Sequence, residues 1–221
     1  MAILKKQSLV DQIYDELKKQ IIELTIPLGS KLNVSELQEK FGVSSTPIRE
    51  AINRLQKDGV VEYENNVGAK VIDIDEKDVY EIQEVSFALL TGAIRYSMQK
   101  TSTTEICKEI KNYIDKLIDS NSKEEFLEYT LSISDIFYKY AYNSRLIGSA
   151  NLMYAQQAIL RTIFTRESTT DDEFKKAHIQ DFLDIYKAVE DNNEIEVIKG
   201  FERNNFRTRK TIIEGLKNFK K

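Results

Sequence analysis

The chain has 221 residues, of which 41% are hydrophobic and 31% are charged. This composition is typical of a globular protein and excludes a disordered or fibrous one. No apolar run approaches the ~20 residues that span a bilayer, and Met1 to Lys6 turns polar too soon for a signal peptide. The single cysteine, Cys107, excludes an intramolecular disulfide and a cysteine-rich zinc site. We therefore expect a cytoplasmic protein of one large or two modest domains with no membrane contact.

The net charge of −4 gives the chain no general attraction to nucleic acid. Residues 1–74 contain ten Lys or Arg and eleven Asp or Glu, and residues 75–221 contain 22 and 25. Any contact with DNA must therefore come from a local basic face rather than from the charge of a whole domain.

The first third of the chain carries most of the turn-forming residues and begins with a helix. Both prolines and half of the eight glycines lie there, at Pro27, Pro47, Gly29, Gly42, Gly59 and Gly68. A first amphipathic helix of about four turns is predicted before them, because apolar residues recur at helical spacing. These are Leu9 or Val10, Ile13, Leu17, Ile21 and Leu24, and the segment 26–29 ends the helix.

Two shorter helices and a hairpin follow. Asn33 is spaced from Glu36 as in a capping box, which predicts a second helix with Leu37 and Phe41 turned inward. After a turn at Gly42, Ser44 caps a third helix that buries Ile48, Ile52 and Leu55 and carries Pro47 in its first turn. The segments 60–64 and 69–74 alternate like two short strands around the loop 65–68. Three helices and a hairpin predict a winged helix-turn-helix over residues 1–74.

From Asp75 onward the pattern is helical throughout. Four residues precede an acidic residue three positions later, as N-caps do: Asp75, Ser102, Ser122 and Thr170. The predicted helices are 75–99, 102–120, 123–142, 144–166, 171–191 and 194–218, with apolar stripes such as Ile106, Ile110, Tyr113 and Leu117 facing a shared core. The fold class is mainly α: a winged helix-turn-helix domain followed by an all-α helical-bundle domain over residues 75–221.

The segment 42–55 resembles the recognition-helix motif of the GntR family of bacterial regulators, most closely in Thr46-Pro47-Ile48-Arg49-Glu50-Ala51. Residues 57–61, 68–71 and 11–21 extend the resemblance, so that it covers residues 8–74 nearly continuously. It implies a transcriptional regulator, a repressor by preference, that binds a palindromic double-stranded DNA operator as a homodimer.

The third helix would place its first turn in the major groove, where Ser44, Ser45 and Thr46 meet phosphates or base edges. Arg49 could pair bidentately with a guanine or with a phosphate. The alternatives are a helix ion pair or solvent for Arg49, and simple capping for the hydroxyls. The candidate DNA-binding residues are Ser44, Ser45, Thr46, Arg49, Arg54, Asn66, Gly68 and Lys70. The family usually has arginine where this chain has Ser45, and often a basic residue at Ser35, so phosphate or base contacts are missing.

The remainder of the chain resembles the FCD effector domain that follows this winged domain in one GntR subfamily, in its shorter, VanR-like six-helix form. The resemblance lies in residues 79–82, 141–146 and 188–191. Many relatives hold a metal there with an Asp and three His. Those positions correspond here to Thr130, Ser134, Phe182 and Asn204, or in another register to Ser134 and Tyr138 for the first two. We therefore expect no bound metal and no cofactor.

A polar pocket for a small-molecule effector is the interpretation of this changed site. The family's pocket Arg and Glu correspond to Ser86 and Leu90. The only histidine, His178, lies one helical turn before Phe182 and could point the same way, although a surface or hydrogen-bonded histidine is the plainer interpretation. The candidate effector-binding residues are Ser86, Thr130, Ser134, Tyr138, His178, Phe182 and Asn204.

Two other functions remain open at this point. An enzyme would need a nucleophile with its base, a phosphate-binding glycine loop or a metal cluster, and the sequence contains none of these motifs. A regulator whose helical domain only dimerises, without sensing a ligand, is the second alternative.

Overall fold

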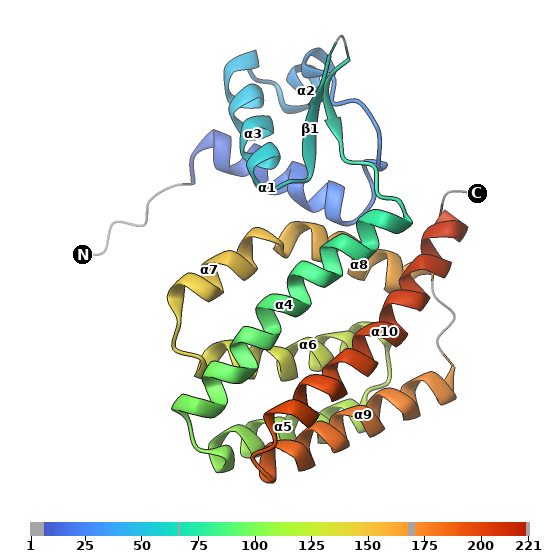
Figure 1. Cartoon of the computed structure of the whole chain (residues 1–221). Coiled ribbons are helices and arrows are strands. Elements are labelled where there is room, and N and C mark those ends of the chain that lie inside the picture. Colours follow the sequence, from blue (N-terminus) through green and yellow to red (C-terminus); the bar gives the residue numbers. More distant parts are fainter. Residues whose placement is uncertain (1–6, 66, 168–170, 220–221) are drawn as a thin grey trace. The chain divides into compact units, whose positions relative to one another are not determined.

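The computed structural model describes residues 7–65, 67–167 and 171–219 (Figure 1). The chain forms two compact units. The first comprises residues 1–75 with 152–162, and the second comprises residues 76–151 with 163–221. The division into domains at residue 74 stays a prediction, and the two units are taken in turn. None of the described helices has both the length and the apolar character that a bilayer crossing requires.

The first unit has the predicted order of three helices and a hairpin. The helices are α1 (Leu9–Ile22), α2 (Val34–Phe41) and α3 (Ser45–Lys57), and the strands are β1 (Val61–Glu64) and β2 (Gly68–Val71). The strands pair antiparallel with Val61 opposite Val71 and Glu64 opposite Gly68. Ile13, Leu17 and Ile21 of α1 are buried, as the helical spacing predicted. The predicted fold class, a winged helix-turn-helix followed by a helical region, is confirmed.

The helix starts differ in detail from those expected. Ser8 caps α1 in a complete capping box with Asp11. Asn33 caps α2, because its side-chain oxygen accepts a hydrogen bond from the backbone amide of Ser35. The side-chain nitrogen of Asn33 donates to the carboxylate of Glu36 at 2.8 Å. This side-chain bond replaces the bond from the Asn33 backbone that a capping box would have. Ser44 is the N-cap residue of α3 but its hydroxyl makes no capping bond there, which leaves that hydroxyl available.

The second unit is built from α4 (Glu76–Lys100), α5 (Thr103–Asp119), α6 (Lys123–Tyr140), α7 (Ser144–Leu152), α8 (Tyr154–Glu167), α9 (Asp172–Glu190) and α10 (Glu194–Phe219), with residues 154–162 of α8 grouped with the first unit. The prediction of one helix over 144–166 is wrong, because the helix breaks at Met153. No residue of α7 is buried, whereas Ala155, Ala158 and Ile159 just after the break are. The break therefore separates an uncovered helix from a buried one, and no glycine or proline at Met153 marks it.

Of the predicted N-caps in this unit, Ser102 and Ser122 are confirmed, since their hydroxyls accept from the amides of Glu105 and Glu125. Thr170 lies outside the described residues. The cap of α9 is instead Asp171, whose carboxylate accepts from the amide of Phe174 at 2.8 Å. A carboxylate at a helix start also interacts favourably with the helix dipole.

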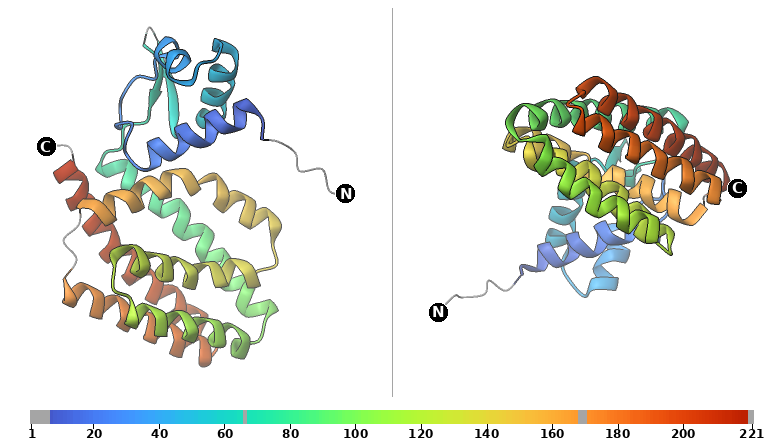
Figure 2. Two further views of the ribbon diagram at one scale, coloured as in Figure 1. Left: turned by 180° about the vertical axis from the view of Figure 1, so that it is seen from behind. Right: turned by 90° about the horizontal axis from the view of Figure 1, so that it is seen from below.

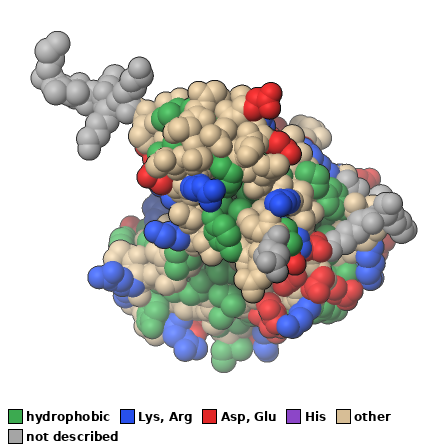
Figure 3. Space-filling model, turned by 90° about the horizontal axis from the view of Figure 1, so that it is seen from above, with side chains coloured by type: hydrophobic (Ala, Val, Ile, Leu, Met, Phe, Trp, Pro, Cys, Tyr) green, Lys and Arg blue, Asp and Glu red, His purple; other side chains and the backbone are tan. Residues whose placement is uncertain are grey.

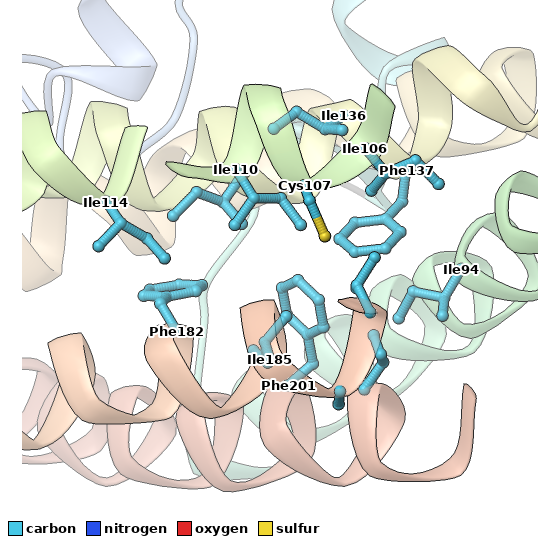
Figure 4. Close-up of a cluster of buried hydrophobic side chains, with 14 of the residues drawn as sticks. Ile94, Ile106, Cys107, Ile110, Ile114, Ile136, Phe137, Phe182, Ile185 and Phe201 are labelled. Atoms are coloured by element: carbon cyan, nitrogen blue, oxygen red, sulfur yellow. The ribbon is translucent and has the colours of Figure 1, made fainter. Parts of the chain in front are cut away.

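A core of large apolar side chains holds the second unit together (Figure 4). The helix pairs α9 and α10, α5 and α6, and α4 and α10 pack side by side, as two opposite views show (Figures 1 and 2). Phe201 of α10 makes edge contacts with Phe137 at 5.4 Å and with Phe182 at 6.1 Å between ring centroids. Figure 4 shows Phe182 pointing from α9 toward Ile110 and Ile114 of α5.

Gly200 sets how closely α9 and α10 approach, since a Cβ atom added to it would collide with Ile185. We expect Gly200→Ala to lower the free energy of unfolding by ~1–3 kcal/mol, because the packed core must shift to accept the methyl group. Gly148→Ala is the matched control: its Cβ would meet nothing within 4 Å, and alanine in a helix is favoured by roughly 0.5–1 kcal/mol. Urea denaturation measures both, and equal effects of the two substitutions would contradict the close approach.

Candidate functional site

The first candidate site is the outer face of α3. α2 ends in Gly42, whose backbone is left-handed with φ of 65°, and α3 begins three residues later. The inner face of α3 is fully buried through Ile48, Ala51, Ile52 and Leu55. Burial of one face fixes the direction of the other. Thr46, Arg49, Glu50 and Asn53 lie on that exposed face, so the helix presents a row of polar side chains on a rigid base.

The two arginines of α3 differ in their ion pairing. Arg49 is exposed and forms no ion pair or hydrogen bond with any residue that the structure describes. Arg54 is paired with Asp11 of α1 through Nη1, and this partner raises the pKa of Arg54. The carboxyl pKa of Asp11 is lowered by hydrogen bonds from Ser8 and Arg54. Arg49 is therefore the unpaired arginine of this helix, whereas Arg54 would have to leave Asp11 to bind a phosphate.

The wing supplies the other predicted contacts. Gly68 has φ of 95°, a conformation that side chains disfavour, and a Cβ there would meet nothing, so its backbone is open to a close neighbour. Lys70 in β2 lies 3.6 Å from Glu64 of β1. Asn66 lies outside the described residues. Of the remaining predicted residues, Ser44 and Thr46 are exposed and Ser45 is half-buried.

Two residues near this face were not predicted. The side-chain oxygen of Asn53 accepts from the hydroxyl of Tyr63 in β1 at 3.2 Å, which orients the amide on the outer face of α3. Lys31 pairs through its backbone with Lys70, which brings a second lysine to the wing. The exposed position of Asn53 follows from the spacing of α3, but the pairing of Lys31 is a long-range contact without a local signal. In Figure 3 basic and acidic side chains are interspersed on the face shown rather than gathered in one basic area.

The second candidate site is a set of buried polar atoms in the helical unit that lack hydrogen-bond partners. Among the described residues these are Thr130 Oγ1, His178 Nδ1, Asn204 Nδ2 and Arg207 Nε. Three of the four belong to the predicted effector residues. Buried polar groups are almost always paired, and each unpaired one costs ~1–3 kcal/mol. They lie on three different helices, α6, α9 and α10.

Aromatic rings and one hydroxyl frame these atoms. The ring of His178 lies 4.2 Å from that of Phe174 and 5.6 Å from that of Phe126. Its Nε2 is 3.0 Å from the hydroxyl of Thr208, which donates to the carbonyl of Asn204. Thr130 lies one turn after Phe126 on α6, and Asn204 lies one turn before Thr208 on α10. The contact between the rings of Phe126 and His178 thus links the helices α6 and α9 that carry unpaired groups, and the contact of His178 with Thr208 links α9 to α10.

Burial keeps His178 uncharged. The side chain is 1% exposed, so the surface alternative is wrong. Its pKa is lowered to about 3 by burial and by the positive charge of Arg207, against a hydrogen bond with the Phe174 backbone that raises the pKa. The hydrogen-bonded alternative holds for Nε2, which lies 3.0 Å from the Thr208 hydroxyl. Arg207 itself is held by Asp181, with 3.0 Å between Nη2 and Oδ2, and Arg203 lies on the other oxygen of the same carboxylate at 3.4 Å.

The other predicted effector residues are less closely connected to this group. Ser86 and Ser134 are half-buried on α4 and α6. Tyr138 is half-buried, and burial together with the charge of Asp135 raises the pKa of its hydroxyl to about 12. Phe182 is fully buried and belongs to the core. No three His, Cys, Asp or Glu side chains in the described residues converge in a way that could hold a metal ion.

The N-terminal unit has the architecture of a winged helix-turn-helix domain, with a helix presented outward next to a two-stranded wing. Residues 9–71 match the family model described as "Bacterial regulatory proteins, gntR family". These residues are therefore similar to the DNA-binding domain of that family, and the two curated relatives described next are named as transcriptional regulators.

One relative is the uncharacterised HTH-type transcriptional regulator YdhC of Bacillus subtilis, 26% identical over 61% of this chain and 62% of its own length. Another is the probable D-xylose utilization operon transcriptional repressor of Paenarthrobacter nicotinovorans, 31% identical over 39% of this chain and 38% of its own. The chain thus spans less than two thirds of the length of these relatives. The solved structure of McbR/YncC from E. coli has the same fold, with a TM-score of 0.69 at 17% identity over 94% of this chain and 98% of that one.

The low pKa of His178 makes stability depend on pH. The folded protein takes up this proton only near pH 3, whereas the unfolded chain takes it up near the ordinary value of 6.5. Between these values the unfolded state binds more protons, so stability falls as pH falls. Relative to His178→Phe, the wild type should lose about 1 kcal/mol for each pH unit between roughly 6 and 4. Urea denaturation over this range measures the difference, and a constant difference would show that the imidazole is hydrated.

Proposed function

We propose that the protein is a transcriptional regulator, by preference a repressor, that binds a two-fold symmetric DNA operator as a homodimer and is controlled by a small molecule bound in its helical unit. The observation that carries the proposal is the outer face of α3. Thr46 and the unpaired Arg49 are exposed on this face, while the opposite face of the helix is fully buried. The match of residues 9–71 to the GntR model supports it, as does the printed name of the xylose-operon repressor. A cytoplasmic location follows from this role.

The contacts to DNA divide by chemistry. A guanidinium can bind guanine O6 and N7 bidentately, which suits the unpaired Arg49. The hydroxyls of Ser44, Ser45 and Thr46 suit phosphates or base edges at the start of the helix. Lys70 and the backbone of Gly68 suit the phosphates beside the wing. Arg54 would contribute only after exchanging Asp11 for a phosphate.

We expect Arg49→Ala to weaken binding to the selected operator by ~1–3 kcal/mol and to relax the base preference at one position of each half-site. The operator comes from selection of bound DNA from a random pool, and fluorescence anisotropy gives the affinity. Arg145→Ala, an exposed arginine of the helical unit, is the charge-matched control and should leave base preference unchanged. If Arg49→Ala binds the operator as the wild type does, Arg49 is not a contact.

The effector site is proposed at the unpaired atoms of Thr130, His178 and Asn204, with Ser86, Ser134, Tyr138 and Phe182 as further residues of an FCD-type domain. The neutral imidazole and the amide and hydroxyl groups would hold the effector by hydrogen bonds rather than through a metal. The supporting observation is that Asn204 is 6% exposed yet its amide nitrogen has no partner. Such a group costs stability unless a ligand pairs it.

Replacing the side-chain amide of Asn204 should raise stability and at the same time abolish effector binding. We expect Asn204→Leu to raise the free energy of unfolding by about 1 kcal/mol, because an unpaired buried donor is removed. The same variant should lose the rise in thermal midpoint that one or more compounds of a polar metabolite panel give the wild type. Asn205→Leu, at the neighbouring residue, is the control. If no compound stabilises the wild type and Asn204→Leu destabilises it, the helical unit only dimerises.

A further inference from the structure

Asn53 lies on the same line of α3 as Thr46 and Arg49. These residues follow one another at intervals of three and four positions, which places them on one face of the helix. All three side chains are exposed, whereas the opposite face is buried through Ile48 and Ile52. From Thr46 to Asn53 the helix rises by about 10 Å, which is the length of about three base steps of ~3.4 Å. A face that reads bases at Thr46 and Arg49 therefore brings Asn53 to the same groove.

The wing strand β1 directs one tyrosine toward this side chain. Successive side chains of a strand point to opposite faces, and directly opposed residues of an antiparallel pair share a face. Tyr63 lies opposite Ala69 and two residues after Val61. Ala69 and Val61 are buried, whereas Tyr63 is 48% exposed. Tyr63 is thus on the inward side of the hairpin at the edge of the core, and its hydroxyl donates to the side-chain oxygen of Asn53 at 3.2 Å.

This hydrogen bond leaves the amide of Asn53 with an occupied acceptor and an open donor. The side-chain nitrogen of an asparagine carries two N–H groups. In the part of the chain that the structure describes, the nitrogen of Asn53 has no hydrogen-bond partner. Because the oxygen and the nitrogen diverge from one carbon atom, holding the oxygen against Tyr63 leaves the N–H groups to face outward.

A donor without an acceptor selects different bases from those that a whole amide selects. Asparagine ordinarily reads adenine by donating to N7 and accepting from N6. That bidentate contact needs the oxygen that Tyr63 occupies. An N–H group alone is paired by an oxygen on the major-groove edge, which guanine presents as O6 and thymine as O4. Adenine and cytosine present amino groups at the equivalent place, and an amino group cannot accept this hydrogen bond.

We infer that Asn53 reads a keto base, guanine or thymine, in each half-site, and that Tyr63 positions its amide for this choice. The inference rests on the proposed function, since it requires an operator in the groove that α3 enters. Asn53 differs in this respect from Arg49, whose guanidinium has donors only and selects acceptors without help. One hydroxyl of the wing therefore decides which base the amide reads.

The base preference of Asn53→Ala tests the contact itself. The full-length wild type first selects its operator from a random duplex pool, and fluorescence anisotropy then gives the affinity for each base pair at every half-site position. At one position guanine or thymine should be preferred to adenine and cytosine by about 3- to 10-fold, the factor that one ordinary hydrogen bond supplies. Asn53→Ala should lose the preference at that position only. The guanine and thymine duplexes show which keto base is read.

Tyr63→Phe tests the positioning role, because it removes the hydroxyl and keeps the ring. With its oxygen released, the amide of Asn53 can make the bidentate contact, so the preference at this position should move to adenine. A bond that only joined the wing to α3 would, when lost, weaken binding to every sequence alike. Two exposed residues of the helical unit supply the matched controls: Asn151→Ala and Tyr142→Phe should keep the wild-type preference at every position.

Two results would overturn the inference. One is an Asn53→Ala variant that keeps the wild-type base preference or loses affinity equally for all sequences, as the loss of a phosphate contact would cause. The other is a Tyr63→Phe variant whose base preference is unchanged. Both leave the proposed function intact, because the wild type has still selected an operator. A wild type that selects no sequence from the pool contradicts the proposed function and this inference with it.

Discussion

Burial of one face of α3 against α1 is the contact on which the proposed DNA-binding surface depends. Ile48, Ile52 and Leu55 have no exposed surface, and helical geometry then places every fourth residue on a fixed outward line. An ion pair of 2.6 Å between Lys18 of α1 and Asp58 at the end of α3 holds the far end of this packing. The outward side chains can therefore be flexible while the helix that carries them is not, which is what a base-reading surface requires.

The helical unit contains one region in which polar rather than apolar atoms are buried. Most of its interior is apolar and closely packed, but four buried atoms around His178, namely Thr130 Oγ1, His178 Nδ1, Asn204 Nδ2 and Arg207 Nε, have no hydrogen-bond partner among the described residues. The rings of Phe126 and Phe174 pack against the imidazole of His178. Replacing these polar groups by apolar ones of the same shape would be neutral or stabilising for folding alone. The proposed effector site gives these groups the partners that the fold alone does not supply.

The features that the sequence predicted correctly are determined by residues close together in the chain. The spacing of Ile13, Leu17 and Ile21 and the caps at Ser102 and Ser122 are set by residues within one or two turns, and these predictions hold. The pairing of Lys31 with Lys70 and the ion pair of Arg54 with Asp11 are tertiary contacts between residues far apart in the chain. The break at Met153 coincides with a change from exposed to buried residues along the helix. A single sequence carries no periodic signal for them.

The same distinction applies to the candidate sites. The outward position of Arg49 could be predicted because it follows from the helix alone, whereas the pairing of Arg54 with Asp11 depends on the packing of α3 against α1. A domain with a net charge of −1 gains little from long-range attraction to DNA. Its affinity must come from a few direct contacts, and the usual arginine at Ser45 is missing. In the proposed dimer each half-site then contributes weakly, and joining two recognition domains raises the effective concentration of the second once the first is bound. A weakly charged winged domain therefore gains more from being joined to a second copy than a strongly basic one would.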